Sequence, residues 1–127
     1  MIETRISYIK KLPNGIIRVE TKEDVELHPD DLDENFRVYK KLFDTTAAKA
    51  LFLIVCGEGG VSNIESRLKF ADPERGKIKK AEAFVVVSLP HRIESNFYKR
   101  FNKPNHPVEI FSTEAAAVKW LLSFNKS

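Results

Sequence analysis

Cysteine is nearly absent from this chain, whose 127 residues include one, Cys56. A single cysteine cannot form a disulfide within the chain, which fits a reducing compartment. Long apolar runs are also lacking, because the stretch from Ala50 to Cys56 is far shorter than the ~20 residues that a membrane-spanning helix needs. The N-terminus is interrupted by charge from Glu3 on and has no apolar core of a signal peptide. We therefore expect a cytoplasmic protein without a transmembrane segment.

Residue patterns of catalytic and metal sites are lacking as well. His28, His91 and His106 each adjoin a proline, which is typical of turns and caps, and no pair has the spacing of metal ligands. Cys56 could act as a nucleophile only beside a base, and a cysteine at a strand end is more often simply buried. We expect no cofactor, no metal ion and no catalytic residue.

Strong charge of one sign is missing too. The formal net charge is +3, and a dedicated nucleic-acid-binding protein concentrates more positive charge than this. Acidic residues gather from Glu20 to Glu34, whereas basic residues dominate from Arg67 to Lys80 and from Arg92 to Lys103. These basic residues form either a solvated face, which we favour, or a surface for an acidic partner, a lipid headgroup or nucleic acid. The candidates are Lys77, Lys79, Lys80, Arg92, Lys99, Arg100 and Lys103.

What is present begins with a predicted β-hairpin. Residues Ile2 to Lys10 and Ile16 to Thr21 alternate apolar and polar side chains, and Asn14-Gly15 between them is a turn signal. A third short strand is expected over Asp24 to Leu27.

A helix is predicted next. Pro29 suits its first position, and the acidic residues after it complement the helix dipole. One apolar stripe follows at spacings of four, three and four residues: Leu32, Phe36, Tyr39 and Phe43. Lys49 to Cys56 then predicts a buried central strand that ends at Gly57.

The remaining chain predicts alternating helices and strands. Ser62 can cap a short helix, and a further helical turn is expected up to Lys80. Ala83 to Val87 predicts a strand buried on both faces, and a helical stretch carries Ile93, Phe97 and Phe101. A strand over Val108 to Phe111 precedes a closing helix with Ala117, Trp120, Leu121 and Phe124 on one face.

These elements predict a single domain over residues 1–127 with an α/β fold, bordering on α+β. A mixed β-sheet with an N-terminal antiparallel hairpin would be covered by helices, and its parallel crossovers would be right-handed.

The order of elements resembles the STAS-like, or SpoIIAA-like, fold of anti-sigma-factor antagonists, and more narrowly the small bacterial STAS/SEC14-type proteins of unknown function. The resemblance is carried by the Asn14-Gly15 hairpin, the helix from Leu32 to Phe43, the strand from Leu51 to Val55, and the stretch from Gly60 to Ser66. It continues with Ala83 to Val87 and with Phe111-Ser112-Thr113-Glu114 before Lys119-Trp120-Leu121. It covers nearly the whole chain.

The resemblance implies two kinds of function. Antagonists of this fold bind a partner kinase and are released when a serine at a helix start is phosphorylated, whereas other relatives bind lipids or other hydrophobic ligands. The antagonist motif has an Asp-Ser pair, and Glu65-Ser66 stands at the matching place, although Arg67-Leu68 replace the Ser-Gly that follows. Ser66 is therefore the candidate phosphoacceptor. The candidate partner or ligand loop comprises Gly57, Gly59, Gly60, Ser62, Glu65 and Arg67.

Three functional hypotheses follow. The first is a non-enzymatic, regulatory protein–protein interaction module that forms a homodimer and binds an unidentified protein partner. The second is a carrier or sensor of a small hydrophobic or lipid ligand, for which nine Phe and three Tyr supply apolar lining. A small enzyme that uses Cys56 or a histidine ranks last, and a nucleic-acid partner is not expected.

Overall fold

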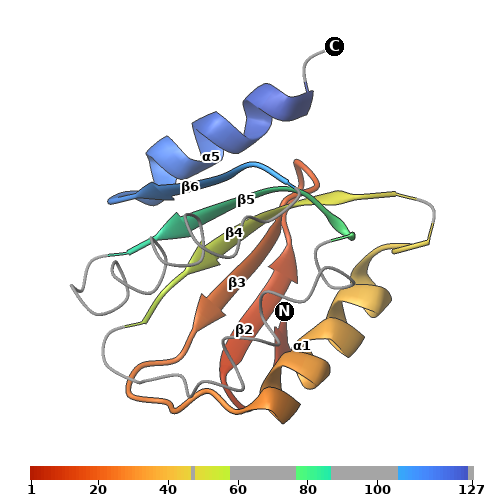
Figure 1. Ribbon diagram of the computed structural model, residues 1–127, viewed down its shortest axis with the longest axis vertical. Coiled ribbons are helices and arrows are strands. Elements are labelled where there is room, and N and C mark those ends of the chain that lie inside the picture. Colours follow the sequence, from red (N-terminus) through yellow and green to blue (C-terminus); the bar gives the residue numbers. More distant parts are fainter. Residues whose placement is uncertain (47, 58–76, 87–105, 126–127) are drawn as a thin grey trace.

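The computed structural model describes residues 1–46, 48–57, 77–86 and 106–125. These residues form one six-stranded sheet in the order β1-β2-β3-β4-β5-β6 (Figure 1). The strands are β1 (Ile2–Glu3), β2 (Ser7–Lys11), β3 (Ile17–Thr21), β4 (Ala50–Val55), β5 (Lys79–Val85) and β6 (Val108–Phe111). Helix α1 (Pro29–Leu42) lies on one face of this sheet and α5 (Glu114–Leu122) on the other, followed by the 3-10 turn η1 (Ser123–Asn125).

The sheet is mixed, as the sequence predicts. Strands β1, β2 and β3 are antiparallel neighbours, whereas β3, β4, β5 and β6 are parallel neighbours. The parallel strands follow one another along the sheet without a reversal of their order. Because β3 to β6 are parallel, their first residues lie along one edge of the sheet and their last residues along the opposite edge.

The predicted hairpin turn is confirmed, but the strand before it is shorter than expected. Gly15 has a φ of +90°, which suits glycine, and the N–H of Leu12 donates to the carbonyl of Ile16 at 2.8 Å. The stretch expected as one strand from Ile2 to Lys10 is instead split into β1 and β2. Thr4 and Ser7 bond to each other there, since the N–H of Ser7 donates to Thr4 Oγ1 at 3.0 Å and turns the chain.

The prediction of a third strand over Asp24 to Leu27 is wrong. Asp24 has a φ of +53°, a left-handed conformation that an extended strand cannot contain, and Leu27 makes only an isolated bridge. This segment is a turn that leads from β3 into α1.

Helix α1 begins as its sequence predicts and ends one residue before the last position of the expected apolar stripe. Pro29 opens it, and the Asp31 side chain accepts a hydrogen bond from the N–H of His28 at 2.8 Å as part of a capping box. Phe43 ends the helix in an extended conformation and lies just outside it. Its ring and that of Tyr39 meet Phe52 of β4 edge to face, with centroids 6.2 and 5.0 Å away.

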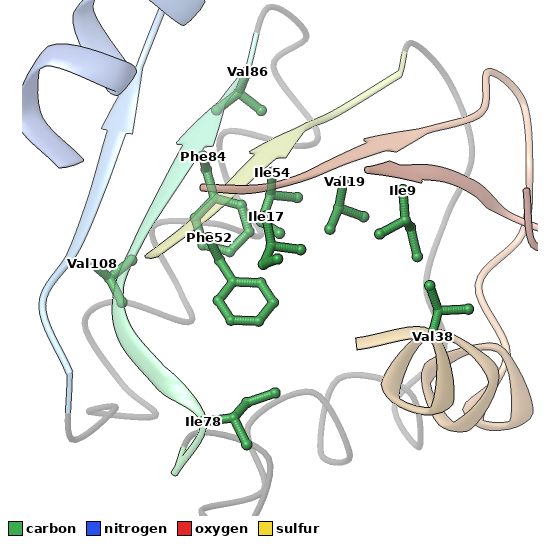
Figure 2. Close-up of a cluster of buried hydrophobic side chains, with 10 residues drawn as sticks. All are labelled: Ile9, Ile17, Val19, Val38, Phe52, Ile54, Ile78, Phe84, Val86 and Val108. Atoms are coloured by element: carbon green, nitrogen blue, oxygen red, sulfur yellow. The ribbon is translucent and has the colours of Figure 1, made fainter. Parts of the chain in front are cut away.

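Two apolar cores lie on the two faces of the sheet. In the core beside α1, Val38 lies across from Ile9 of β2, and Phe52 and Phe84 extend the cluster toward β5 (Figure 2). The core beside α5 consists of Ile16, Leu51, Leu53, Ala81, Ala83, Val85, Ala117 and Leu121. Burial on both faces explains why β4 is an uninterrupted apolar run and why β5 is apolar from Ala83 to Val85.

The C-terminal elements are confirmed, with one correction. Strand β6 and helix α5 lie where the sequence predicts them, and Thr113 caps α5 by accepting from the N–H of Ala116 at 3.3 Å. The expected helical turn up to Lys80 is wrong, because β5 begins at Lys79 and pairs with β4 there. Val87, the helix expected around Phe97 and the helix expected after Ser62 lie outside the described residues.

Candidate functional site: the ends of the sheet and a buried charge cluster

The predicted loop after β4 starts with a tight contact at Gly57. The N–H of Gly57 donates to Thr21 Oγ1 at 2.7 Å, and this hydroxyl donates to the carbonyl of Val55 at 3.3 Å. A Cβ atom at Gly57 would lie 2.5 Å from the Thr21 carbonyl oxygen, closer than real contacts allow. Glycine is therefore required here by the close approach of the chain to the end of β3.

The other predicted loop residues cannot be placed. Gly59, Gly60, Ser62, Glu65, Ser66 and Arg67 lie outside the described residues. Cys56 is half-buried at the end of β4, and its N–H donates to the carbonyl of Val85 at 3.0 Å.

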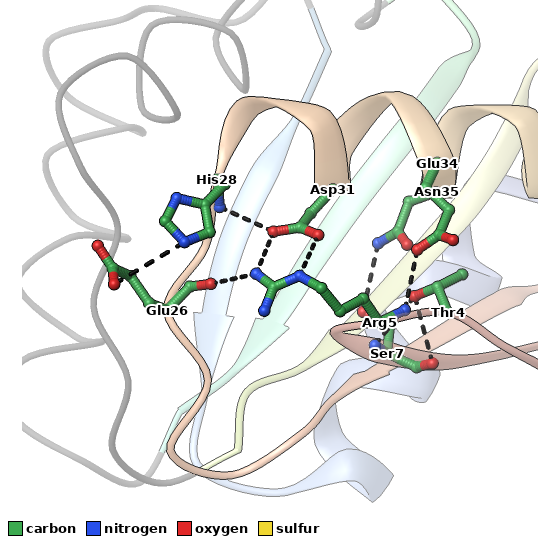
Figure 3. A network of polar contacts seen from close by, with 8 residues as sticks. All are labelled: Thr4, Arg5, Ser7, Glu26, His28, Asp31, Glu34 and Asn35. Atoms are coloured by element: carbon green, nitrogen blue, oxygen red, sulfur yellow. Dashed lines mark hydrogen bonds and ion pairs between the residues drawn. The ribbon is translucent and has the colours of Figure 1, made fainter.

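A polar network ties the start of α1 to the turn between β1 and β2 (Figure 3). The Arg5 guanidinium donates to both carboxylate oxygens of Asp31, from Nε at 2.7 Å and from Nη2 at 2.5 Å, and also to the Glu26 carbonyl. This bidentate pairing holds the pKa of Asp31 below its ordinary value, against the raising effect of burial. The Arg5 N–H donates to Glu34 Oε1 at 2.8 Å, so two successive turns of α1 are attached.

A second ion pair attaches α5 to the opposite face. Arg18 of β3 donates from Nη2 to Glu114 Oε1 at 2.5 Å and to Glu20 Oε1 at 2.9 Å. Glu114 is the first residue of α5, where a negative charge also complements the helix dipole. Arg18 thus joins β3 to the closing helix across 96 residues of sequence.

A cluster of three buried titratable side chains lies between β5 and the start of β6. Glu82 is fully buried, its Oε2 accepts from Lys79 Nζ at 2.7 Å, and its Oε1 lies 3.0 Å from His106 Nε2. Burial raises the pKa of Glu82, but the Lys79 charge and the His106 hydrogen bond outweigh this effect and leave the pKa lowered. Glu82 is therefore the anion of the cluster.

A β-bulge brings two of these side chains to the same face. Residues three apart in a regular strand point to opposite faces of a sheet. Lys79 pairs with Ala50, but the next residue of β4, Leu51, pairs with Ala81, so Lys80 is an extra residue in β5. The bulge places Lys79 beside Glu82, with its Nζ 5.7 Å from the centre of the Phe52 ring.

This cluster was not predicted from the sequence and corrects two expectations. Lys79, expected on a basic surface, is buried, whereas Lys77 and Lys80 are exposed. His106, expected in a turn or cap, is buried against Glu82. The available signal was Glu82 itself, a single acidic residue between two alanines at the start of the apolar run from Ala83 to Val87.

Comparison with known proteins identifies the family. The family model described as "Domain of unknown function (DUF7793)" matches residues 10–125. The chain belongs to this family. No curated protein matches it.

The fold of this DUF7793 chain is similar to that of a solved bacterial protein. The crystal structure of an uncharacterized protein from the DUF3478 family with a SpoIIAA-like fold, from Shewanella loihica PV-4, matches with a TM-score of 0.63 and 12% sequence identity. The match covers 95% of this chain and 98% of that chain. The protein therefore has the SpoIIAA-like α/β fold that its sequence predicts.

The buried charged side chains of the described residues are held in ion pairs. Within these residues, no group of three or more His, Cys, Asp and Glu side chains is arranged to hold a metal ion. No helix in the same part of the chain is long and apolar enough to cross a membrane. What the site offers is a set of internal ion pairs that attach β6, α1 and α5 to the sheet.

Proposed function

We propose that this DUF7793 protein is a single-domain, non-enzymatic interaction module that binds a protein partner and acts in regulation as a homodimer. The SpoIIAA-like fold supports the proposal, because the resemblance to anti-sigma-factor antagonists implies binding to a protein. One fold can host many functions, so the proposal also rests on the arrangement of charges.

The observation that carries the proposal is how the buried titratable groups of the described residues are used. Asp31 pairs with Arg5, and Glu82 binds both Lys79 and His106. A catalytic carboxylate or lysine has to reach a substrate, whereas these groups are directed at one another inside the fold. Their arrangement supports a structural role and a function at the protein surface.

The strand order supports the same proposal. In open α/β sheets, ligand crevices form at the carboxyl ends of strands where the strand order reverses. Strands β3 to β6 follow one another without reversal in the described sheet. This order favours a surface contact over a crevice of that kind.

Native and denaturing mass spectrometry of the protein purified from its own source tests the proposal. We expect a homodimer, and we expect a second protein to be retained at fixed stoichiometry after chemical cross-linking in the cells. A small mass that is lost on denaturation would instead favour the carrier of a hydrophobic ligand. A phosphate mapped to Ser66 would favour a phosphorylation switch, and a monomer with neither a cross-linked protein nor an adduct would contradict the proposal.

A further inference from the structure

Many exposed basic side chains of the described residues lie near one edge of the sheet, the edge at which β4 and β5 begin. Helix α1 runs back along the sheet between the parallel strands β3 and β4, so its last turn lies near the start of β4, where Tyr39 and Phe43 meet Phe52 (Figure 1). The end of β2 lies at the same edge, because Lys11 pairs with Ile17 at the start of β3.

Exposed lysines gather at this edge, and we call them the lysine end. They come from the end of β2, the last turn of α1, the residue before β4 and the start of β5. They are Lys10, Lys11, Lys40, Lys41, Lys49 and Lys80. None of them forms an ion pair with a carboxylate within the described part of the chain. Asp44, which follows α1, accepts hydrogen bonds from Thr46.

Several other basic side chains are neutralised instead, among them Arg18, the cross-strand neighbour of Lys10. Arg5 pairs with Asp31, and Arg18 pairs with Glu20 and Glu114. Lys22 Nζ lies 2.5 Å from Glu3 Oε2. The net charge of +3 is small, yet the lysine end gathers exposed positive charge at one edge of the described sheet.

We propose that the lysine end is the docking surface for an acidic segment of the protein partner, an inference that rests on the proposed function. Lys11, Lys49 and Lys80 lie at or next to the ends of β2, β4 and β5, with β3 between β2 and β4, and neighbouring strands lie ~4.8 Å apart. Lysines spread along this edge suit an extended acidic chain. The exposed Arg37 lies one helical turn before Lys41 and adds to the positive charge.

The apolar surface supports a protein segment over nucleic acid or a membrane. Among the described large apolar side chains, Met1 alone is exposed. Binding of single-stranded nucleic acid uses exposed aromatic side chains for stacking, and interfacial membrane binding uses an apolar face. In the described part of the chain one methionine supplies neither, so the lysine end itself offers charge, which carboxylates on a flexible chain can match.

Binding of an oligoglutamate peptide to the full-length protein tests this inference. The double variant Lys41→Gln/Lys49→Gln removes two charges from the lysine end. Lys119→Glu is the matched control, because it lowers the net charge by the same amount at an exposed position of α5. We expect Kd to rise roughly threefold to tenfold in the double variant and to stay within about twofold in the control. Added salt should weaken binding to the wild type. Since these lysines form no ion pair in the described part, unchanged circular dichroism should confirm folding.

The inference is overturned if Lys119→Glu weakens binding as much as the double variant does, because net charge alone would then explain it. It is also overturned if an oligothymidylate or a phosphatidylserine vesicle binds more tightly than the peptide with the same sensitivity to the variants. A partner that cross-links equally to wild type and double variant would leave the proposed function standing and remove this surface from it.

Discussion

Lys79 and Glu82 are three residues apart in one β-strand, yet their charged atoms meet 2.7 Å apart on one face of the sheet. The extra residue Lys80 makes this possible by shifting the register against β4. The Glu82 N–H also donates to the Pro107 carbonyl at 2.9 Å, and its side chain contacts His106. One buried carboxylate thus joins the bulge in β5 to the start of β6.

Removing the charge of Glu82 should be strongly destabilising. Glu82→Gln leaves Lys79 buried without its counter-charge, and we expect a loss of about 3–5 kcal/mol in the free energy of unfolding. The double variant Lys79→Met/Glu82→Gln removes the unpaired lysine charge and keeps an acceptor for His106, so it should recover part of the lost stability. Urea denaturation of both single variants and the double variant gives the coupling energy. Additive effects of the two substitutions would show that the pair is not coupled.

The contact between Arg5 and Asp31 should stabilise the start of α1. Asp31→Asn removes the charge that Arg5 binds bidentately and weakens the capping box, and we expect a loss of about 1–2 kcal/mol by urea denaturation. Asp30→Asn is the matched control, since Asp30 is exposed in the same helical turn, and it should change stability by less than about 0.5 kcal/mol. Equal losses in the two variants would mean that the helix dipole alone explains the effect.

Acid should remove the contribution of Asp31. Because the folded-state pKa of Asp31 is lowered, its stabilising effect is present above the unfolded pKa of about 3.9 and is lost as the pH falls through the folded value. The stability difference between wild type and Asp31→Asn should therefore shrink between about pH 5 and pH 2. Unfolding measured across this range checks the sign, and a difference that grows toward acid would contradict it.

Gly57 should tolerate no side chain. Its Cβ would lie 2.5 Å from the Thr21 carbonyl oxygen, a backbone atom with little freedom to move, so Gly57→Ala should cost about 1–3 kcal/mol. Gly15→Ala has open space around it, and only its φ of +90° is strained. Comparing Gly57→Ala with Gly15→Ala separates crowding from backbone strain. Thr21→Ser leaves the carbonyl in place, so it should not relieve the destabilisation caused by Gly57→Ala. Wild-type thermal stability in Gly57→Ala would show that the chain can move aside.

Local sequence patterns were sufficient for most of the described elements. Asn14-Gly15 marked the hairpin, Pro29 with acidic neighbours marked the start of α1, and the apolar run after Lys49 marked β4. The wrong expectations fall where the backbone departs from an extended chain, as at the contact between Thr4 and Ser7 or at Asp24 with its positive φ. Alternation of side chains predicts an extended chain, but it does not report a side chain that bonds to its own backbone.

The candidate sites depended on the tertiary structure for a physical reason. By itself the sequence determined the class of fold, because hydrophobic periodicity and turn residues act over a few neighbours. It could not place Lys79, Glu82 and His106 together, since a bulge in β5 and the parallel pairing of β5 with β6 create this contact, in which Glu82 and His106 are 24 residues apart. Nor could it show that exposed lysines from β2, α1, β5 and the residue before β4 lie near one edge, while Arg5 and Arg18 are neutralised by carboxylates. Charged groups interact through space, so only the folded sheet determines which charges are neighbours.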